Sequence, residues 1–553
     1  MKPCHFIGYW GYQKDGSCVW EVNPTEATPE KLSENGIIAA ISAGGFSDCP
    51  DAWVKVESDR LILGRDPFGR VPLYWTQVEQ VIWFSSQFQQ LLPIIKSPQV
   101  SIPALYGYSC FSYIPTPLSP VENIFAIPAG TELIFQGKPL KYTRRRLQEW
   151  REAPELIRDE NLAVSQLQIL LKDAIYRQIS ELPDSPVGVF LSGGIDSSVV
   201  AALLVQAGIK VRAYALDFGN DGYSELPYAE IVARYLDIPL VKVAATPKEL
   251  KGAIAATAQA LDIPFGDGVT TPLYLLNRVA SQETAVIFNG ENGDQLFAGW
   301  TNKPLIAGGI YNGVKPIEDF NQQYLRTFGR LYGYEAEIFS DRIYNEVQNL
   351  NPQSWLEDAL DPSFCPSFFQ RLRRATLMLK GAQNIQPRAT NLSFACGLWV
   401  RSPFCDLPLT EWTFQLSGEL CLQGACEKYI LKRAVESWLP PEIVWREKRG
   451  MGVPLKIWYF NQLWSEIGQW LNPGVLRDEG RWQPHIAANI IAGKLGEGLQ
   501  TRYIGNVIWM LIMWQAWRRS VLGEKASGQS LDHPFWLPPQ VWKYGRRFLV
   551  WEN

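Results

Sequence analysis

Histidine and long apolar runs are both scarce in this sequence. Only three histidines occur among the 553 residues, at His5, His485 and His533, and they lie far apart. Neither a histidine-ligated metal centre nor a Ser-His-Asp triad is therefore expected. No stretch approaches the roughly 18 uncharged apolar residues of a membrane-spanning helix. The amino terminus lacks the basic-then-apolar pattern of a signal peptide, so we expect neither a membrane span nor secretion.

Paired cysteines and a strong excess of one charge are also missing. The nine cysteines are an odd number and form no C-x-x-C pair, which predicts reduced thiols and a cytoplasmic location. The formal net charge of -4 gives no indication of nucleic-acid binding, and we expect the run Arg144-Arg145-Arg146 to be a solvated linker face. The length and the 46% hydrophobic content predict a two-domain globular enzyme.

The most informative segment is Leu191-Ser192-Gly193-Gly194-Ile195-Asp196-Ser197-Ser198. It separates an apolar run at Val187–Leu191, which predicts a buried strand, from a predicted helix at Val199–Gln206. The two glycines permit positive φ angles, and the three serines place hydroxyls around N–H groups at the positive end of the helix, an arrangement that suits a polyanion. Asp196 would repel phosphate, so we expect it to hold a bridging Mg²⁺. A turn that merely joins strand to helix is the alternative.

The Walker pattern GxxxxGK, which serves cleavage between the β- and γ-phosphates of ATP, is absent. The segment instead resembles the PP-loop of the ATP pyrophosphatase group. That resemblance implies cleavage between the α- and β-phosphates and transfer of AMP to a substrate, so adenylation is favoured over phosphorylation.

Further strings resemble the asparagine synthetase family, whose relatives include β-lactam synthetases and lasso-peptide cyclases. The segment from Phe288 to Gly299 is similar to the family loop SGEGxDExFGGY. The resemblance implies that this loop closes over pyrophosphate and that Asp294, 98 positions after Asp196, is a second Mg²⁺ ligand. It also implies that Leu216 and Asn289-Gly290 frame the adenine through their backbone.

Three more segments carry the resemblance. They are Pro264 to Leu276, Arg401 to Asp406, which is similar to the string R-x-P-F-L-D on the substrate side, and Lys428 to Pro454. In the last, Lys448 holds the position of the family lysine that stabilises the adenylate and the charge of the following step. The alternative is that Lys448 is one more cation in a solvated run.

Two departures from the family bear on its chemistry. Trp399 stands where the family has a glutamate that assists proton transfer from the attacking amine. An indole N–H only donates, so another group must accept that proton. Gln295 likewise replaces a glutamate, which removes a negative charge near Asp294 and is expected to alter the affinity for Mg²⁺.

The amino-terminal region departs further. Glutamine-hydrolysing members expose a cysteine directly after the initiator methionine, whereas this sequence begins Met1-Lys2-Pro3-Cys4 and lacks the family strings R-H-R-G-P and N-G-E-I-Y-N. A scaffold string persists at Leu63 to Trp75 and Phe84 to Gln87, similar to the end of the amidotransferase-like domain. We expect a degenerate glutaminase; a Cys4 nucleophile exposed by proteolysis is the alternative.

The predicted fold class is α/β with two domains. Residues 1–150 are expected to form a degenerate Ntn-type amidotransferase-like sandwich, β-rich and of the α+β kind. Residues 151–553 are expected to form a PP-loop parallel α/β domain, adenine nucleotide alpha hydrolase-like, with a helical C-terminal part. A helix predicted at Asn161–Ile179 leads into the PP-loop strand, and strands near Arg212–Leu216 and Ala285–Asn289 alternate with helices.

Together these features predict an ATP- and Mg²⁺-dependent, AMP-forming amide-bond synthetase without its own glutaminase. Its partners would be a small-molecule or peptide carboxylate and an amine donor, with no nucleic acid or membrane; a homodimer or a biosynthetic partner protein stays open. The alternatives are a glutamine- or ammonia-dependent asparagine synthetase and a non-catalytic ATP-binding relative.

Overall fold

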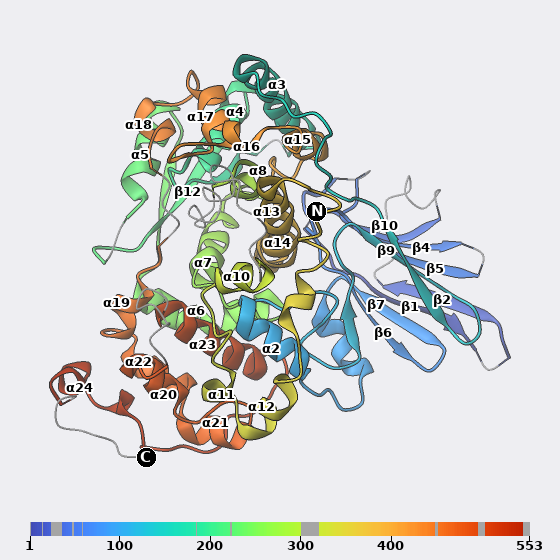
Figure 1. Ribbon diagram of the computed structural model, residues 1–553, viewed down its shortest axis with the longest axis vertical. Helices are drawn as coiled ribbons and strands as arrows, with labels where there is room; N and C mark the ends of the chain where they lie inside the picture. Colours follow the sequence, from blue (N-terminus) through green and yellow to red (C-terminus); the bar gives the residue numbers. More distant parts are fainter. Residues whose placement is uncertain are drawn as a thin grey trace.

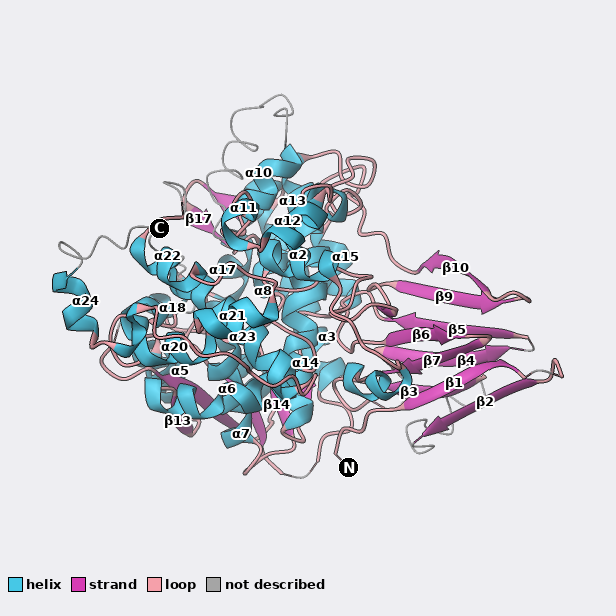
Figure 2. Cartoon of the chain, turned by 90° about the horizontal axis from the view of Figure 1, so that it is seen from below, coloured by secondary structure: helices cyan, strands magenta, loops and turns pink. Residues whose placement is uncertain are grey.

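Two antiparallel sheets packed face to face form the amino-terminal part of the chain. The computed structural model describes residues 2–13, 15–23, 36–46, 49–57, 59–183, 185–221, 224–299, 320–447, 452–495 and 504–545. One sheet has the strand order β2-β1-β7-β6-β8 and the other β10-β9-β5-β4-β3, and Figure 2 shows their strands layered beside the helices. The ring of Trp75 in one sheet lies 4.9 Å from that of Phe135 in the other, since both strands turn apolar side chains inward.

The strands of this sandwich are short. Their bounds are β1 (Ile7–Tyr12), β2 (Cys18–Asn23), β3 (Ile37–Ile41), β4 (Ala52–Glu57), β5 (Arg60–Arg65), β6 (Tyr74–Val78), β7 (Val81–Ser85), β8 (Ile124–Ala126), β9 (Thr131–Gln136) and β10 (Lys141–Arg146). The helix α2 (Ile102–Phe111) follows β7 and leaves the sandwich: the Tyr108 hydroxyl donates to the Met510 carbonyl at 2.8 Å.

A five-stranded parallel sheet is the centre of the second part. Its order is β13 (Leu240–Ala244), β12 (Val211–Asp217), β11 (Val187–Phe190), β14 (Val286–Phe288) and β15 (Trp399–Arg401). Every neighbouring pair is parallel. Strand order reverses between β11 and β14, so this edge is the switch point at which open α/β sheets bind ligands.

Helices cover this sheet and continue into a helical C-terminal part, as Figure 1 shows. Those between the strands are α3 (Glu160–Gln178), α4 (Ile195–Gln206), α5 (Leu226–Tyr235), α6 (Pro247–Leu261), α7 (Thr270–Ala280), α8 (Gly293–Phe297), α10 (Phe320–Arg326), α11 (Glu335–Ile338), α12 (Asp341–Val347), α13 (Phe368–Thr376) and α14 (Gln386–Ala395). A π-helical segment, Leu377–Ile385, joins α13 to α14.

The remaining elements follow β15. They are α15 (Leu407–Thr413), α16 (Gly418–Cys421), β16 (Leu422–Gln423), β17 (Cys426–Glu427), α17 (Tyr429–Val435), α18 (Pro441–Val444), α19 (Leu455–Tyr459), α20 (Trp464–Trp470), α21 (Pro473–Glu479), α22 (Ile486–Ala492), α23 (Ile504–Ser520) and α24 (Pro539–Gly545). Within the described part of the chain, no helix has the length and apolar character needed to cross a membrane. The helix α23, which carries the Ile-Trp-Met-Leu-Ile-Met-Trp run, is buried in the core.

These elements confirm the predicted fold class. The strand predicted at Val187–Leu191 is β11, and the helix predicted at Asn161–Ile179 is α3. The helix predicted at Val199–Gln206 begins earlier, at Ile195, because Gly194 takes an extended conformation and serves as the N-cap.

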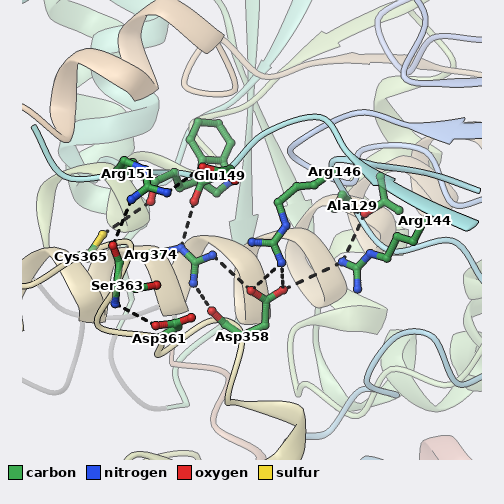
Figure 3. A network of polar contacts seen from close by, with 12 residues as sticks. Ala129, Arg144, Arg146, Glu149, Arg151, Asp358, Asp361, Ser363, Cys365 and Arg374 are labelled. Carbon is green, nitrogen blue, oxygen red and sulfur yellow. Dashed lines mark hydrogen bonds and ion pairs between the residues drawn. The ribbon is translucent and has the colours of Figure 1, made fainter.

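The arginine run is mostly exposed, as predicted for a solvated face, but it belongs to a strand and not to a linker. Arg144, Arg145 and Arg146 all belong to β10. Arg146 lies 2.8 Å from Asp358, to which Arg374 also donates, and Figure 3 shows these side chains converging on that carboxylate. Arg144 and Arg146 therefore join the sandwich to the segment before α13 by ion pairs with Asp358, whereas Arg145 pairs with Glu132 of β9.

His5 lies where the two parts meet, which gives a prediction for acid stability. Burial lowers the pKa of His5 from 6.5 to about 4, although its hydrogen bond to Ser86 opposes the shift. Because the unfolded chain then binds the proton more readily, stability falls as the pH drops through 6.5 towards 4. Between pH 7 and pH 5 the wild type should lose about 1–2 kcal/mol more than His5→Gln in urea unfolding. Equal losses of unfolding free energy in the wild type and in His5→Gln would contradict this account.

Candidate functional site

A cavity of about 570 Å³ opens at the carboxyl edge of the parallel sheet. Residues after β11, β12 and β14 line it; of the predicted nucleotide and metal residues these are Leu191, Ser192, Gly194, Asp196, Ser197, Leu216, Asn289, Gly290 and Asp294. Figure 1 shows α4, α8 and α17 gathered at this end of the sheet. The fold thus brings two loops from distant parts of the sequence to the switch point.

The first loop is a tight turn into α4. Gly193 has φ +73°, and a Cβ there would lie 2.5 Å from the Tyr228 and Ala229 backbone, so only glycine fits. Gly194 has φ -75° and caps the helix in an extended conformation, so only Gly193 of the two glycines takes a positive φ.

The serines of the turn play different parts. Ser197 faces the cavity, and its Oγ lies 3.2 Å from the Ser192 Oγ. Ser198 is fully buried, with its Oγ donating to the Gly194 carbonyl at 2.8 Å. Ser198 therefore stabilises the turn from its buried side, whereas Ser192 and Ser197 line the cavity, where their hydroxyls can bind a ligand.

The second loop fits against the first through glycines. A Cβ on Gly290 would lie 2.6 Å from the Ser197 nitrogen, and a Cβ on Gly293 would lie 2.4 Å from the Asp196 Oδ1. The Asn289 side chain braces this loop: its Oδ1 accepts from the Glu291 N–H at 3.1 Å and from the Ser402 hydroxyl at 2.9 Å. The backbone of the second loop therefore lies so close to Ser197 and to the Asp196 carboxylate that no side chain would fit at Gly290 or Gly293.

We predict that Gly293→Ala disrupts this contact. The added methyl would displace the Asp196 carboxylate or the second loop, so nucleotide affinity should fall by about tenfold or more. Gly252→Ala is the matched control, because a Cβ at Gly252 on α6 meets no atom within 4 Å. Calorimetric titration with ATP and Mg²⁺ measures both. Equal affinities for the two variants would contradict the prediction.

Asp196 and Asp294 converge on a lysine that the sequence analysis did not single out. The Lys428 Nζ lies 2.5 Å from the Asp294 Oδ1 and also contacts the Asp196 Oδ2. The lysine side chain is 1% exposed and precedes α17 in a left-handed conformation. A Cβ on Gly299 would lie 2.1 Å from its Cε, so the chain after α8 closes over it. The sequence signal that could have identified Lys428 is its position as the first residue of the segment Lys428 to Pro454, which resembles the family.

The two carboxylates fit the predicted Mg²⁺. The Asp196 Oδ1 is buried without a hydrogen-bond partner in the described structure, which leaves a ligand oxygen unused. No three His, Cys, Asp or Glu side chains gather into a metal cage among the described residues. A site with two protein carboxylates suits Mg²⁺, because proteins commonly bind this ion through one or two carboxylates together with substrate phosphates. Asp196 and Asp294 would hold the ion.

A second group of cavity residues was also missed by sequence reasoning. Asp267 accepts hydrogen bonds from Arg330 at 3.0 Å and from Arg388 at 2.9 Å. Burial raises the pKa of Asp267, but the Arg388 and Arg330 guanidinium groups outweigh it and hold the pKa well below its usual range. Lys380 lies on the same wall of the cavity. Arg330 and Lys380 lie where the resemblance to the family fades, so no motif marked them.

Several predicted residues lie elsewhere. Trp399 packs against Gly45 and Phe394 at the amino end of β15, away from the cavity lining. Arg401 is buried at the junction of the two parts, where its Nε donates to the Gly44 carbonyl at 2.9 Å. Gln295 does line the cavity. Lys448 lies outside the described residues.

Comparison with protein families identifies the chain. The profile described as asparagine synthase matches residues 166–519, which is more than half of the sequence. The chain belongs to the asparagine synthase family. A second profile, described as a glutamine amidotransferase domain, matches residues 52–145. The expected resemblance is thereby confirmed for both parts, and with it an ATP-using carbon–nitrogen ligase of this family.

Individual relatives are distant. Asparagine synthetase (glutamine-hydrolyzing) 1 of Bacillus subtilis (strain 168) is 23% identical over 509 residues, covering 87% of this chain and 78% of that protein. A putative asparagine synthetase (glutamine-hydrolyzing) of Mycobacterium bovis is 23% identical over 436 residues, covering 73% of this chain and 66% of the relative, just under two thirds of its length. The solved NH3-dependent NAD synthetase from Campylobacter jejuni aligns at 14% identity with a TM-score of 0.20, covering 41% of this chain and 94% of that one. So low a score supports no structural argument.

Proposed function

We propose that this member of the asparagine synthase family is an ATP- and Mg²⁺-dependent, AMP-forming amide-bond synthetase that receives its amine without hydrolysing glutamine. The observation that carries the proposal is the convergence of Asp196, Asp294 and Lys428 beside a glycine-rich turn at the sheet's switch point. N–H groups at the start of α4 and the Ser192 and Ser197 hydroxyls would bind the phosphates.

The first half-reaction joins a substrate carboxylate to the α-phosphate. A carboxylate oxygen attacks the α-phosphorus, the bond to the bridging oxygen breaks, and pyrophosphate leaves. Mg²⁺, when held by Asp196 and Asp294, would neutralise phosphate charge. The Lys428 ammonium lies between the same carboxylates and adds a fixed positive charge. Lys448 is proposed to stabilise the adenylate, as in the family string that it matches.

In the second half-reaction an amine attacks the acyl carbon, AMP leaves, and the amine loses a proton. Trp399 cannot accept that proton. We propose Glu291, which the second loop places on the cavity wall, as the acceptor.

Glu291→Gln tests this assignment. The amide is isosteric but cannot take a proton, so formation of the amide product should fall by about 100-fold, whereas substrate-dependent pyrophosphate release should persist. Glu442→Gln, on the exposed first turn of α18, is the control. Measuring pyrophosphate and amide separately distinguishes the steps. Unchanged amide formation would remove Glu291 from the mechanism.

The source of the amine distinguishes this proposal from its rival. The absent glutamine-pocket strings favour ammonia, an amine within the substrate, or a peptide amine, of which we prefer the last two. Glutamine-dependent asparagine synthesis is the second candidate, because relatives named as such align over most of the chain.

Pyrophosphate release from ATP and Mg²⁺ tests the proposal across a panel of carboxylates and precursor peptides, with and without glutamine or ammonia. We expect one class of acid to release pyrophosphate and form AMP without glutamine. Release of glutamate from glutamine would favour the second candidate. ATP binding with no substrate-dependent pyrophosphate release would contradict both and indicate a non-catalytic relative.

A further inference from the structure

The helix α3 carries a row of exposed apolar side chains. Leu162, Ile169 and Tyr176 are 48%, 60% and 59% exposed, and they follow one another at intervals of seven residues. Residues seven apart lie two turns apart on the same side of a helix. A surface helix normally turns polar and charged side chains to water. Single exposed apolar residues need no explanation, whereas a row of them is typical of an interaction surface.

The row lies opposite the face by which α3 packs into the fold. Leu167 and Leu171 on that inner face are buried, and the helix contacts α4, α15 and α17. Figure 1 shows α3 at the upper end of the molecule. Leu407, which is 39% exposed at the start of α15, lies near the Tyr176 end of the row, because Arg177 binds the neighbouring Asp406 at 2.7 Å. The exposed row is therefore additional to the apolar surface that α3 uses for its own packing.

The row is symmetric about the middle of the helix. Because α3 spans Glu160–Gln178, Ile169 is its central residue, and Leu162 and Tyr176 lie seven residues to either side of it. A two-fold axis through Ile169 would place two copies of α3 antiparallel. Ile169 would then pack against Ile169 of the second copy, and Leu162 against Tyr176 of the second copy. An interface of this kind uses the same surface on both chains.

The charges of α3 fit the same arrangement. In the antiparallel pair, each of the four charged residues of the helix opposes a neutral side chain of the second copy that can form a hydrogen bond: Glu160 opposes Gln178, Lys172 opposes Gln166, Asp173 opposes Ser165, and Arg177 opposes Asn161. A parallel pair would instead place Lys172 against Lys172 and Asp173 against Asp173, and such juxtaposed like charges are destabilising. Antiparallel packing also brings the positive amino-terminal end of each helix near the negative carboxyl-terminal end of the other.

We propose that the outer face of α3 binds α3 of a second copy of this chain, so that the protein forms an antiparallel, two-fold symmetric dimer. The pairing would remove the apolar row from water. One helix face is small compared with the roughly 800 Å² per partner of a standard interface, so we expect a dissociation constant of about 10 µM. Among the described residues that line the cavity, none belongs to α3, so each copy keeps its own site and the dimer is independent of the proposed function.

Sedimentation of the full chain tests the pairing. Between about 1 and 100 µM the wild type should shift from monomer to dimer. Ile169→Glu would bring two carboxylates together at the two-fold axis and should raise the dissociation constant by about tenfold or more. Ile457→Glu, the same change at a 42%-exposed residue of α19, is the matched control and should dimerise as the wild type does. A wild type that stays monomeric at the highest concentration, or unchanged dimerisation of Ile169→Glu, would overturn the proposal.

Cysteine cross-linking tests the antiparallel register. Ile169→Cys should form a disulfide-linked dimer under mild oxidation, because the axis brings the two copies of position 169 together. Leu162→Cys alone should not cross-link, whereas Leu162→Cys combined with Tyr176→Cys should. Oxidised wild type and oxidised Ile457→Cys control for the nine native cysteines and for random collision. Failure of Ile169→Cys to cross-link above these controls, or cross-linking of Leu162→Cys alone as efficiently as the double variant, would overturn the proposal.

Discussion

Asp196→Asn should lower substrate-dependent pyrophosphate release by about 100-fold or more. Asparagine keeps the shape of the side chain but removes the charge that would hold Mg²⁺, and it places an amide where the buried Oδ1 now lies unpartnered. The Mg²⁺ concentration for half-maximal rate should rise by about tenfold. Pyrophosphate release measured over a Mg²⁺ series gives both quantities.

The control for this substitution is Asp237→Asn. Asp237 lies in an exposed turn with φ 53°, a conformation that asparagine tolerates. The rate of pyrophosphate release by Asp237→Asn, and the dependence of that rate on Mg²⁺, should match those of the wild type. If Asp196→Asn retained its rate to within threefold at every Mg²⁺ concentration, the assignment of Asp196 as a metal ligand would fail.

Lys428→Met is expected to have the largest effect on stability. Lys428 is buried between two carboxylates, so methionine leaves Asp196 and Asp294 facing each other with no cation between them. Removing one member of a buried ion pair costs about 3–5 kcal/mol, and the partial exposure of Asp294 favours the lower end of that range. Pyrophosphate release should also be lost, because the fixed positive charge beside the phosphates is gone.

Mg²⁺ provides the distinguishing measurement for Lys428. In the variant, Asp196 and Asp294 no longer contact the lysine and should bind Mg²⁺ more tightly, so thermal unfolding with added Mg²⁺ should show a larger rise in Tm than in the wild type. Lys242→Met, which removes a lysine from an exposed ion pair with Glu230, should change neither Tm nor its response to Mg²⁺. Equal Mg²⁺ responses in Lys428→Met and wild type would show that the lysine only fills space.

The glycine-rich turn before α4 could be located from the sequence because its signal is local. An apolar strand, a glycine that must take φ +73°, and a helix follow one another within a few residues, and β11, Gly193 and α4 are placed accordingly. The resemblance to the family also implied that Asp196 and Asp294 act together, and the structure brings both carboxylates to Lys428.

Residues brought to the site by tertiary packing carry no such local signal. Lys428 begins a segment that resembles the family, but its contact with the two aspartates depends on the fold, and Arg330 and Lys380 lie outside any recognised string. Sequence reasoning expected a local consequence of Trp399 for catalysis. In the structure, the Val400 N–H donates to the Ala43 carbonyl at 2.8 Å, which fixes Trp399 against the amino-terminal part instead. Such contacts depend on packing between parts that no local pattern encodes.

Oxygen transfer tests the central claim of adenylation most directly. With a substrate acid carrying ¹⁸O in its carboxyl group, the attack on the α-phosphorus and later cleavage of the acyl adenylate should leave one ¹⁸O atom in AMP. Mass spectrometry of the nucleotide product reads this out. Labelled AMP, formed together with pyrophosphate and dependent on Asp196, is the predicted result. Formation of ADP with the label in inorganic phosphate would contradict the account.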